Sequence, residues 1–228
     1  MARLRIHIDD AKEAAKPAAP TSQLAVAPRR AKATAFAPAG QSTQMIVGAD
    51  AADDRAILAT SANLYGAYRL KRVYYSAFSP IPDAPRALPS KPPPLVREHR
   101  LYQADWLMRF YGYAHEEIVG SADGMLALDI DPKLAWALAH RERFPVDLNR
   151  APQELLLRVP GLGVRSVQRL VQARRVRRLR LDDLARLRVP LAKVMPFVSV
   201  AGHHPGASLD AASLAARLRP PPVQASLF

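Results

Sequence analysis

The chain has 228 residues, with 33 lysines and arginines against 20 acidic residues and no cysteine. The lack of cysteine excludes zinc–thiolate sites, cysteine-held iron–sulfur clusters, disulfide scaffolds and cysteine nucleophiles. A formal net charge of +13 favours a polyanionic partner. No apolar run approaches the roughly 20 residues of a membrane span, and the basic N-terminus lacks the apolar segment of a secretory signal. We therefore expect a soluble, cytoplasmic protein.

The N-terminal residues 1–38 are rich in alanine and proline. This composition predicts a short helix over residues 9–16, followed by an extended arm. We expect no packed domain before residue 39.

Residues 39–80 have the pattern of a strand–helix–strand unit. The apolar run over 44–49 is typical of a buried parallel strand. Asp53 or Asp54 can cap a following helix, and residues 70–77 have the pattern of a second strand. Two parallel strands and one helix leave a sheet edge and an open face, so we expect this unit to need further strands or a partner.

Proline clusters and charge divide the rest of the chain. Residues 81–95 form a proline-rich connector, because proline lacks the N–H that a helix or an inner strand requires. A helical region follows over 96–145. Residues 146–200 form a second helical block, in which ten arginines and one lysine face only three acidic residues between 151 and 200. The chain ends in a flexible tail over 201–228, stiffened by three consecutive prolines.

The basic block contains a motif that points to DNA. Residues 155–170 resemble the helix-hairpin-helix module of DNA repair proteins, with a Pro-Gly-hydrophobic-Gly turn between two helices. Two glycines let backbone N–H groups approach a phosphate oxygen with no Cβ in the way, and the start of the second helix adds positive potential. Such contacts position a protein on DNA without reading its sequence. The expected DNA-binding residues are Pro160, Gly161, Leu162, Gly163, Val164, Arg165 and Arg169.

Other interpretations of the basic block stay open. A Pro-Gly turn between two core helices is the alternative for the hairpin, and the arginine excess disfavours it. A degenerate second copy is predicted, with helices over 181–187 and 193–200 around a turn over 188–192. That turn has no glycine, so we expect the second copy to support the packing of the first. The arginine-rich run 174–180 either contacts phosphates or forms a solvated helix end.

Most of the chain also resembles a known family. Residues 38–200 are similar to the C-terminal half of a radical S-adenosylmethionine (SAM) family that is assigned to DNA modification or repair and associated with uracil-DNA-glycosylase-like proteins. The stretches that carry the resemblance are Ala37–Asp50, Leu70–Ile81, Arg97–Leu107 and Phe144–Arg150. The resemblance implies that residues 39–80 are the late part of a partial (β/α) barrel. The expected fold class is therefore α+β and mostly α, with a barrel fragment, a helical region and a helix-hairpin-helix domain.

The chain departs from that family in one decisive respect. The family holds a 4Fe-4S cluster with a three-cysteine motif in its N-terminal half, whereas this chain has no cysteine. Alone, it should neither bind a cluster nor start radical chemistry. We expect the product of a split or truncated gene, complemented by a separate N-terminal half.

The resemblance also implies contacts to SAM from Gln44, Gly48, Asp50 and Ser76. A glycine lets a ligand lie against a strand end. At Gly48, strand packing explains the glycine as well as a SAM contact does. We assign no catalytic and no metal-ligating residue, because the histidines lack the spacing of a metal site on one helix face.

The last five residues resemble the peptide with which bacterial repair and replication proteins bind the sliding clamp. Leu227 and Phe228 would fill an apolar pocket, Gln224 would make polar contacts, and Ser226 matches the usual pattern. Ala225 stands where leucine is usual. A frayed terminus is the alternative.

Together these features predict the DNA-binding C-terminal portion of a radical SAM protein of DNA modification or repair, inactive by itself. The alternative is a free-standing DNA-binding adaptor that recruits repair partners through its hairpin and C-terminal peptide. An enzyme independent of the cluster ranks last. The expected partners are DNA, a separate radical SAM half, the sliding clamp and a uracil-DNA-glycosylase-like protein. We expect no membrane association and a nucleoid-associated location.

Overall fold

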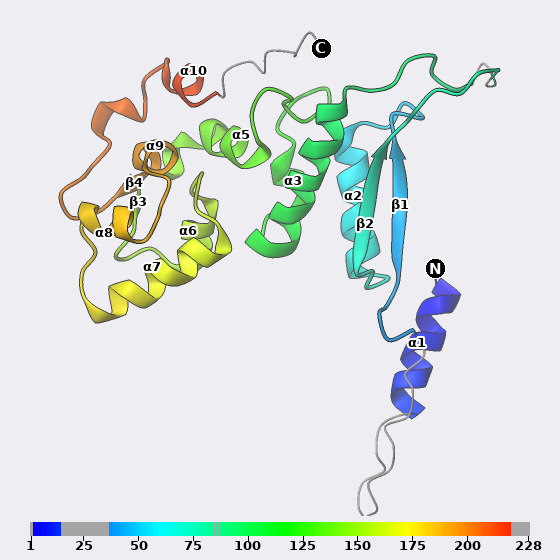
Figure 1. The fold of residues 1–228 in the computed structure, drawn as a ribbon, viewed down its shortest axis with the longest axis horizontal. Helices are drawn as coiled ribbons and strands as arrows, with labels where there is room; N and C mark the ends of the chain where they lie inside the picture. Colours follow the sequence, from blue (N-terminus) through cyan, green and yellow to red (C-terminus); the bar gives the residue numbers. More distant parts are fainter. Residues whose placement is uncertain (1, 15–36, 84, 86, 220–228) are drawn as a thin grey trace, which may run out of the picture.

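The computed structural model describes residues 2–14, 37–83, 85 and 87–219. The chain is a mixed α/β protein, and two small parallel sheets accompany the helices in the described part. One sheet lies at one end of the molecule and the C-terminal helices at the other, with helix α3 (Leu95–Tyr111) between them (Figure 1). Among these residues, no helix has both the length and the apolar character to cross a membrane.

The first helix begins earlier than the sequence predicted. Helix α1 covers Ala2–Ala14, whereas the pattern suggested 9–16. The guanidinium of Arg5 donates to the carboxylate of Asp9 at 2.5 Å and to the carbonyl oxygen of Ala67 at 2.9 Å. The contact with Asp9 lies within α1, and the contact with Ala67 holds α1 against the residue that follows helix α2 (Asp54–Gly66). The predicted arm over 15–36 lies outside the described residues.

The predicted strand–helix–strand order is confirmed. Its elements are β1 (Ser42–Val47), α2 (Asp54–Gly66) and β2 (Arg72–Ala77). The strands are parallel, with Ser42 opposite Arg72 and Val47 opposite Ala77. Asp53 caps α2, because its carboxylate accepts from the N–H of Ala56 at 2.7 Å.

Helix α3 (Leu95–Tyr111) packs on β2 and on α2, beside the sheet. Under the sheet, the Tyr75 hydroxyl donates to the Ser61 hydroxyl at 2.8 Å, and the Tyr65 hydroxyl donates to the Asp105 carboxylate at 2.6 Å. Burial, reinforced by the hydrogen bond to Asp105, raises the pKa of Tyr65 to about 12. The polar groups under the sheet are thus paired with one another.

The other face of this sheet is open. Exposed side chains alternate along both strands with buried or half-buried ones. The exposed side chains include those of Gln44, Ile46 and Tyr74. Among the described residues, no third strand pairs with either strand. The described residues thus form a two-stranded sheet and no barrel.

Short helices connect this unit to the C-terminal part. They are α4 (His115–Ile118), α5 (Pro132–Ala139) and the 3-10 helix η1 (Arg141–Arg143). Asp131 caps α5 by accepting from the N–H of Leu134 at 2.9 Å, with Pro132 in the first turn. This is the start that the Asp-Pro pair predicted.

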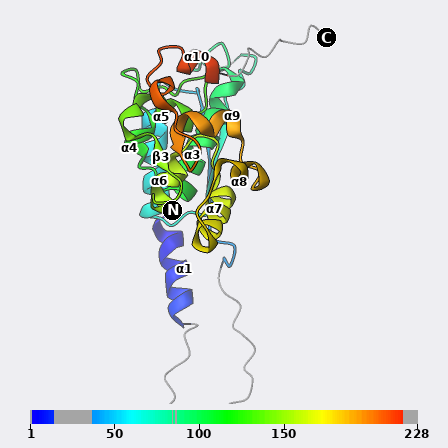
Figure 2. The same cartoon turned by 90° about the vertical axis from the view of Figure 1, so that its left-hand side faces the viewer.

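The C-terminal part contains two successive helical hairpins. The elements are β3 (Val146–Asp147), α6 (Gln153–Arg158), α7 (Val164–Val176), α8 (Leu181–Arg186), α9 (Leu191–Val194), η2 (Met195–Phe197), β4 (Val198–Ser199), η3 (Gly206–Ser208) and α10 (Leu214–Leu218). Strand β3 pairs in parallel with β4 and so joins the start of this part to the end of the second hairpin. Figure 2, turned by 90°, brings the hairpin helices toward the viewer.

The helix predicted over 193–200 is wrong. Helix α9 ends at Val194, a 3-10 turn follows, and residues 198–199 form strand β4. Pro196 lacks an N–H and does not extend an α-helix, and the backbone of residues 198–199 pairs with β3 instead. One hydrophobic cluster runs from Val47 in β1 to Leu214 in α10, so the strand unit and the hairpins share a core.

Candidate nucleic-acid interface

The first hairpin consists of α6, a turn over 159–163 and α7. Leu156, Leu162 and Leu170 anchor it, with at most 1% of their surfaces exposed. Gly163 is the N-cap residue of α7 and provides no side-chain hydrogen bond to the helix. The first N–H groups of a helix have no partner inside the helix, and the dipole makes this end positive. The start of α7 therefore suits an anion.

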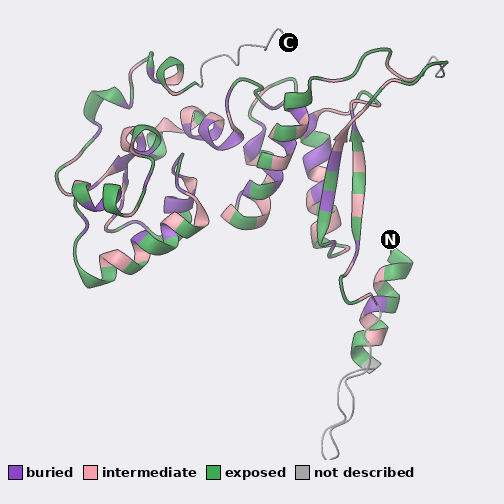
Figure 3. Ribbon diagram, in the orientation of Figure 1, coloured by how far each residue is buried: buried purple, intermediate pink, exposed green. Residues whose placement is uncertain are grey.

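Arginines follow the start of α7 along one exposed face. Arg165 and Arg169 lie one turn apart and are both exposed. The Arg169 guanidinium donates to the Ser166 hydroxyl at 3.2 Å. Gln172 and Arg175, further along the helix, are also exposed. In Figure 3, green exposed stretches recur along this helix. Arg165, Arg169 and Arg175 thus add positive charge along the exposed side of α7, next to the positive end of the helix.

Several arginines of the basic block stabilise the fold instead. Both guanidinium NH groups of Arg158 donate to the Glu117 carboxylate at 2.9 Å. Arg174 donates to the carbonyl oxygen of Ala151 at 2.7 Å, and Arg177 pairs with Asp183. The other cations of the block outside α7 are exposed: Arg150, Arg178, Arg180, Arg186, Arg188 and Lys193. The run 174–180 is thus divided between structural and exposed arginines.

Gly161 is required for a reason that the sequence did not reveal. Its φ is +83°, which an L side chain rarely adopts, and a Cβ there would lie 3.0 Å from atoms of Lys193 and Val194. The second hairpin therefore packs where that Cβ would point. At Gly163 a Cβ would meet only the Tyr111 hydroxyl, at 3.6 Å, so the space beside this residue is less crowded than the space beside Gly161.

The predicted DNA-binding residues separate into two groups. Pro160 and Leu162 are buried and Val164 is half-buried, so these side chains shape the turn. Arg165 and Arg169 extend into solvent. Contact with a phosphate would come from these two side chains and from the backbone at the start of α7.

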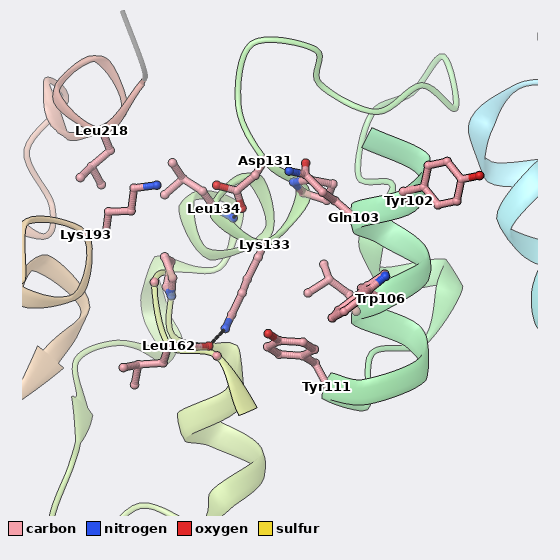
Figure 4. A pocket seen from close by; sticks show the side chains of 15 residues that line it. Tyr102, Gln103, Trp106, Tyr111, Asp131, Lys133, Leu134, Leu162, Lys193 and Leu218 are labelled. Atoms are coloured by element: carbon pink, nitrogen blue, oxygen red, sulfur yellow. Dashed lines mark hydrogen bonds between the residues drawn. The ribbon is translucent and has the colours of Figure 1, made fainter. Parts of the chain in front are cut away.

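A pocket of about 500 Å³ lies between α3 and the hairpin turn (Figure 4). Trp106 and Tyr111 project into it from α3, and Gly161–Gly163 line the opposite side. The start of α5 contributes Asp131 and Lys133. This pocket was not predicted, because it joins segments that are far apart in the sequence.

Lys133 is buried beside this pocket, with 9% of its surface exposed. Its ammonium donates to the carbonyl oxygen of Leu162 at 2.6 Å and lies 4.7 Å from the centre of the Tyr111 ring. Burial lowers the pKa of Lys133 to about 7, and the Asp131 carboxylate opposes that shift. The available signal was a single lysine in the otherwise apolar helix α5.

Two of the residues expected to contact SAM share one face of the sheet, and a third follows β1. Gln44 and Ser76 belong to the open face, because Gln44 pairs with Tyr74 and Ser76 with Ile46 in the sheet register. The Asp50 carboxylate, just after β1, accepts from the N–H of Ala52 at 3.0 Å.

Gly48 does not offer a cradle for adenosine. It has a φ of +80°, and a Cβ there would lie 2.8 Å from Cγ of Pro93. The proline connector fills the space that a ligand would need. Gly48 is therefore explained by packing, which was the alternative for this position.

The last two kinds of candidate site are a metal site and the clamp-binding peptide. In the described part of the chain, no group of three His, Cys, Asp or Glu side chains could hold a metal ion. The expected clamp-binding residues Gln224, Ser226, Leu227 and Phe228 lie outside the described residues, and that assignment stays a prediction.

No protein-family model, no curated protein and no solved structure matches the chain.

Proposed function

We propose that this chain binds the phosphate backbone of DNA through the hairpin of α6 and α7, without reading the base sequence. The observation that carries the proposal is the start of α7, where Gly163 leaves helix N–H groups without a side-chain cap beside two exposed arginines. A phosphate there would accept from backbone N–H groups and face the positive end of the helix. Contacts of this kind supply position and affinity but no base specificity.

The salt dependence of DNA binding tests this proposal. Each phosphate neutralised on duplex DNA contributes roughly 0.9 to the slope of log affinity against log salt. We expect Arg165→Ala and Arg169→Ala each to make the slope less steep by roughly 0.9, because each removes one phosphate contact. Lys91→Ala, which removes an exposed cation in the proline connector, should leave the slope unchanged. Equal slopes for all variants would refute the hairpin assignment.

We further propose that the strand unit is a docking place for a separate chain, as expected of the C-terminal portion of a radical SAM protein. The support is the open face of β1 and β2, with Ile46 and Tyr74 exposed, since parallel sheets are generally covered on both faces. The residues of this chain do not fit the cofactors of that family. It has no cysteine for a cluster, and Pro93 occupies the space beside Gly48.

Hydrogen exchange tests the docking. The partner to search for and supply is a chain that carries the three-cysteine motif and is encoded near this one in the same genome. We expect amides of residues 42–47 and 72–77 to gain protection when it is added, because unpaired edges exchange readily. Unchanged protection would favour the alternative of a free-standing DNA-binding adaptor.

A further inference from the structure

The pocket between α3 and the hairpin turn has aromatic walls that are open to solvent. Trp106 keeps 52% of its surface exposed although it is one of the largest apolar side chains in the protein. Its ring is 5.1 Å from that of Phe110, which lies outside the pocket lining. Tyr111 lies below Trp106 in Figure 4, on the same side of the pocket. Exposed aromatic faces are the platforms on which unstacked bases bind.

Polar groups converge on the same space. Gln103 and Asp131 contribute an amide and a carboxylate to the lining, and Lys133 lines the pocket beside them with its ammonium bonded to the Leu162 carbonyl oxygen. Such groups can hydrogen-bond to the edge of a base. Lys193 adds a positive charge at the side of α9. The volume of about 500 Å³ falls within the roughly 300–1,000 Å³ of small-molecule sites.

The pocket and the expected phosphate position share one turn. Gly161–Gly163 line the pocket, and Gly163 is also the residue that begins α7. A nucleotide whose phosphate lies at the start of α7 would therefore have its base near the pocket. A base inside a duplex is stacked and paired, so only an unpaired base can enter.

We propose that this pocket takes an unstacked nucleobase of the DNA strand that the hairpin holds. The inference rests on the proposed function, and it adds a substrate class: DNA with an unpaired nucleotide, such as a bulge, a gap or a single-stranded end. The base would stack on Trp106 and contact the polar groups of α3 and α5. The positive surface around α7 and Lys193 favours a nucleic-acid strand over an apolar peptide as the occupant.

The test compares two DNA probes with the full chain at fixed salt. One probe is a short duplex with a single bulged nucleotide, and the other is the same duplex without the bulge. We expect the wild type to prefer the bulged probe by about tenfold or more, the effect of one stacked base. Trp106→Ala should reduce the preference to less than about threefold, and Trp106→Phe should retain part of it.

Phe110→Ala is the matched control, because it removes a neighbouring exposed aromatic ring outside the pocket lining. It should keep the full preference for the bulged probe. Stacking should also quench the fluorescence of Trp106, and this signal should be lost in Trp106→Phe, where only the buried Trp136 remains.

Three results would overturn the inference, and the first two also separate it from the proposed function. Duplex binding that depends on Arg165, with no preference for the bulge and no quenching, would refute the nucleobase pocket and leave the hairpin assignment standing. If Trp106→Ala still prefers the bulged probe as strongly as the wild type does, the unpaired base binds outside this pocket. Absence of binding to both probes would refute both proposals.

Discussion

The ammonium of Lys133 donates a 2.6 Å hydrogen bond to the carbonyl oxygen of Leu162 and so connects the start of α5 with the turn between α6 and α7. Lys133 is buried, and its aliphatic chain crosses the wall of the pocket (Figure 4). Without this contact, the carbonyl oxygen would lose its charged donor in a buried setting. Lys133 thus helps to hold the turn in the shape that orients the start of α7.

The protonation of Lys133 should make stability depend on pH. Its pKa in the folded protein is about 7, against 10.5 for an unperturbed lysine. Between these values the unfolded chain binds more protons, so the free energy of unfolding should rise with pH by at most about 1.4 kcal/mol per unit. Below the folded pKa this dependence should vanish. Urea unfolding at a series of pH values measures it.

The Lys133→Met variant is the control for this dependence. It keeps an unbranched side chain of similar length without a titrating group, so its unfolding free energy should lack the rise above about pH 7. Parallel pH curves for the variant and the wild type would show that another group is responsible.

The two turn glycines should respond differently to alanine. Gly161→Ala forces a side chain into a positive φ and against the second hairpin, so we expect a loss of about 1–3 kcal/mol in unfolding free energy. Gly163→Ala has an ordinary backbone conformation and only the Tyr111 hydroxyl nearby, so it should cost less than about 1 kcal/mol. Urea unfolding of both variants tests this order.

Gly163→Ala then probes the phosphate approach in a folded protein. Its Cβ would stand where the phosphate is expected, so DNA affinity should fall while stability is nearly kept. An unchanged affinity in the folded variant would argue that phosphates approach the hairpin elsewhere.

Local sequence patterns predicted those parts of the fold that local interactions determine. The cap at Asp131 and the strand–helix–strand order follow from residues close together in the chain. Lys133 could not be assigned in this way, because its partner Leu162 lies 29 positions further along. The role of Gly161 likewise depends on a hairpin about 30 residues later, since Lys193 and Val194 occupy the space beside it.

The site shows the same division. Helical spacing predicted that Arg165 and Arg169 share a face, and they are both exposed. The pocket beside them was not predictable, because its walls come from α3, α5 and the hairpin turn. The spacing of residues within one helix does not indicate how α3, α5 and the hairpin turn pack against one another.

The buried ion pair between Arg97 and Asp54 should be important for stability. The guanidinium Nε lies 2.8 Å from the carboxylate, which also accepts from the N–H of Leu126 at 2.9 Å. Arg97→Met would leave the Asp54 carboxylate buried without its counter-ion, a loss of about 3–5 kcal/mol. Thermal unfolding provides the measurement.

A surface pair gives the matched comparison. Arg219 and Asp129 approach to 2.9 Å with about half of each side chain exposed. Arg219→Met should therefore cost no more than about 1 kcal/mol, since exposed pairs contribute little. Similar losses for Arg97→Met and Arg219→Met would contradict the structural importance assigned to the buried pair.

The last prediction concerns residues 224–228, which lie outside the described residues and resemble a clamp-binding peptide. A peptide this short buries little area and must be ordered on binding, so we expect an affinity of about micromolar strength for the bacterial sliding clamp. Leu227 and Phe228 should provide most of it, as apolar anchors dominate small interfaces. Ala225→Leu should tighten binding, whereas truncation of the last two residues should abolish it and leave DNA binding intact. Fluorescence anisotropy of labelled peptides against the purified clamp measures this binding. If neither the native nor the Ala225→Leu peptide binds at high micromolar clamp, the segment is a frayed terminus and not a clamp-binding peptide.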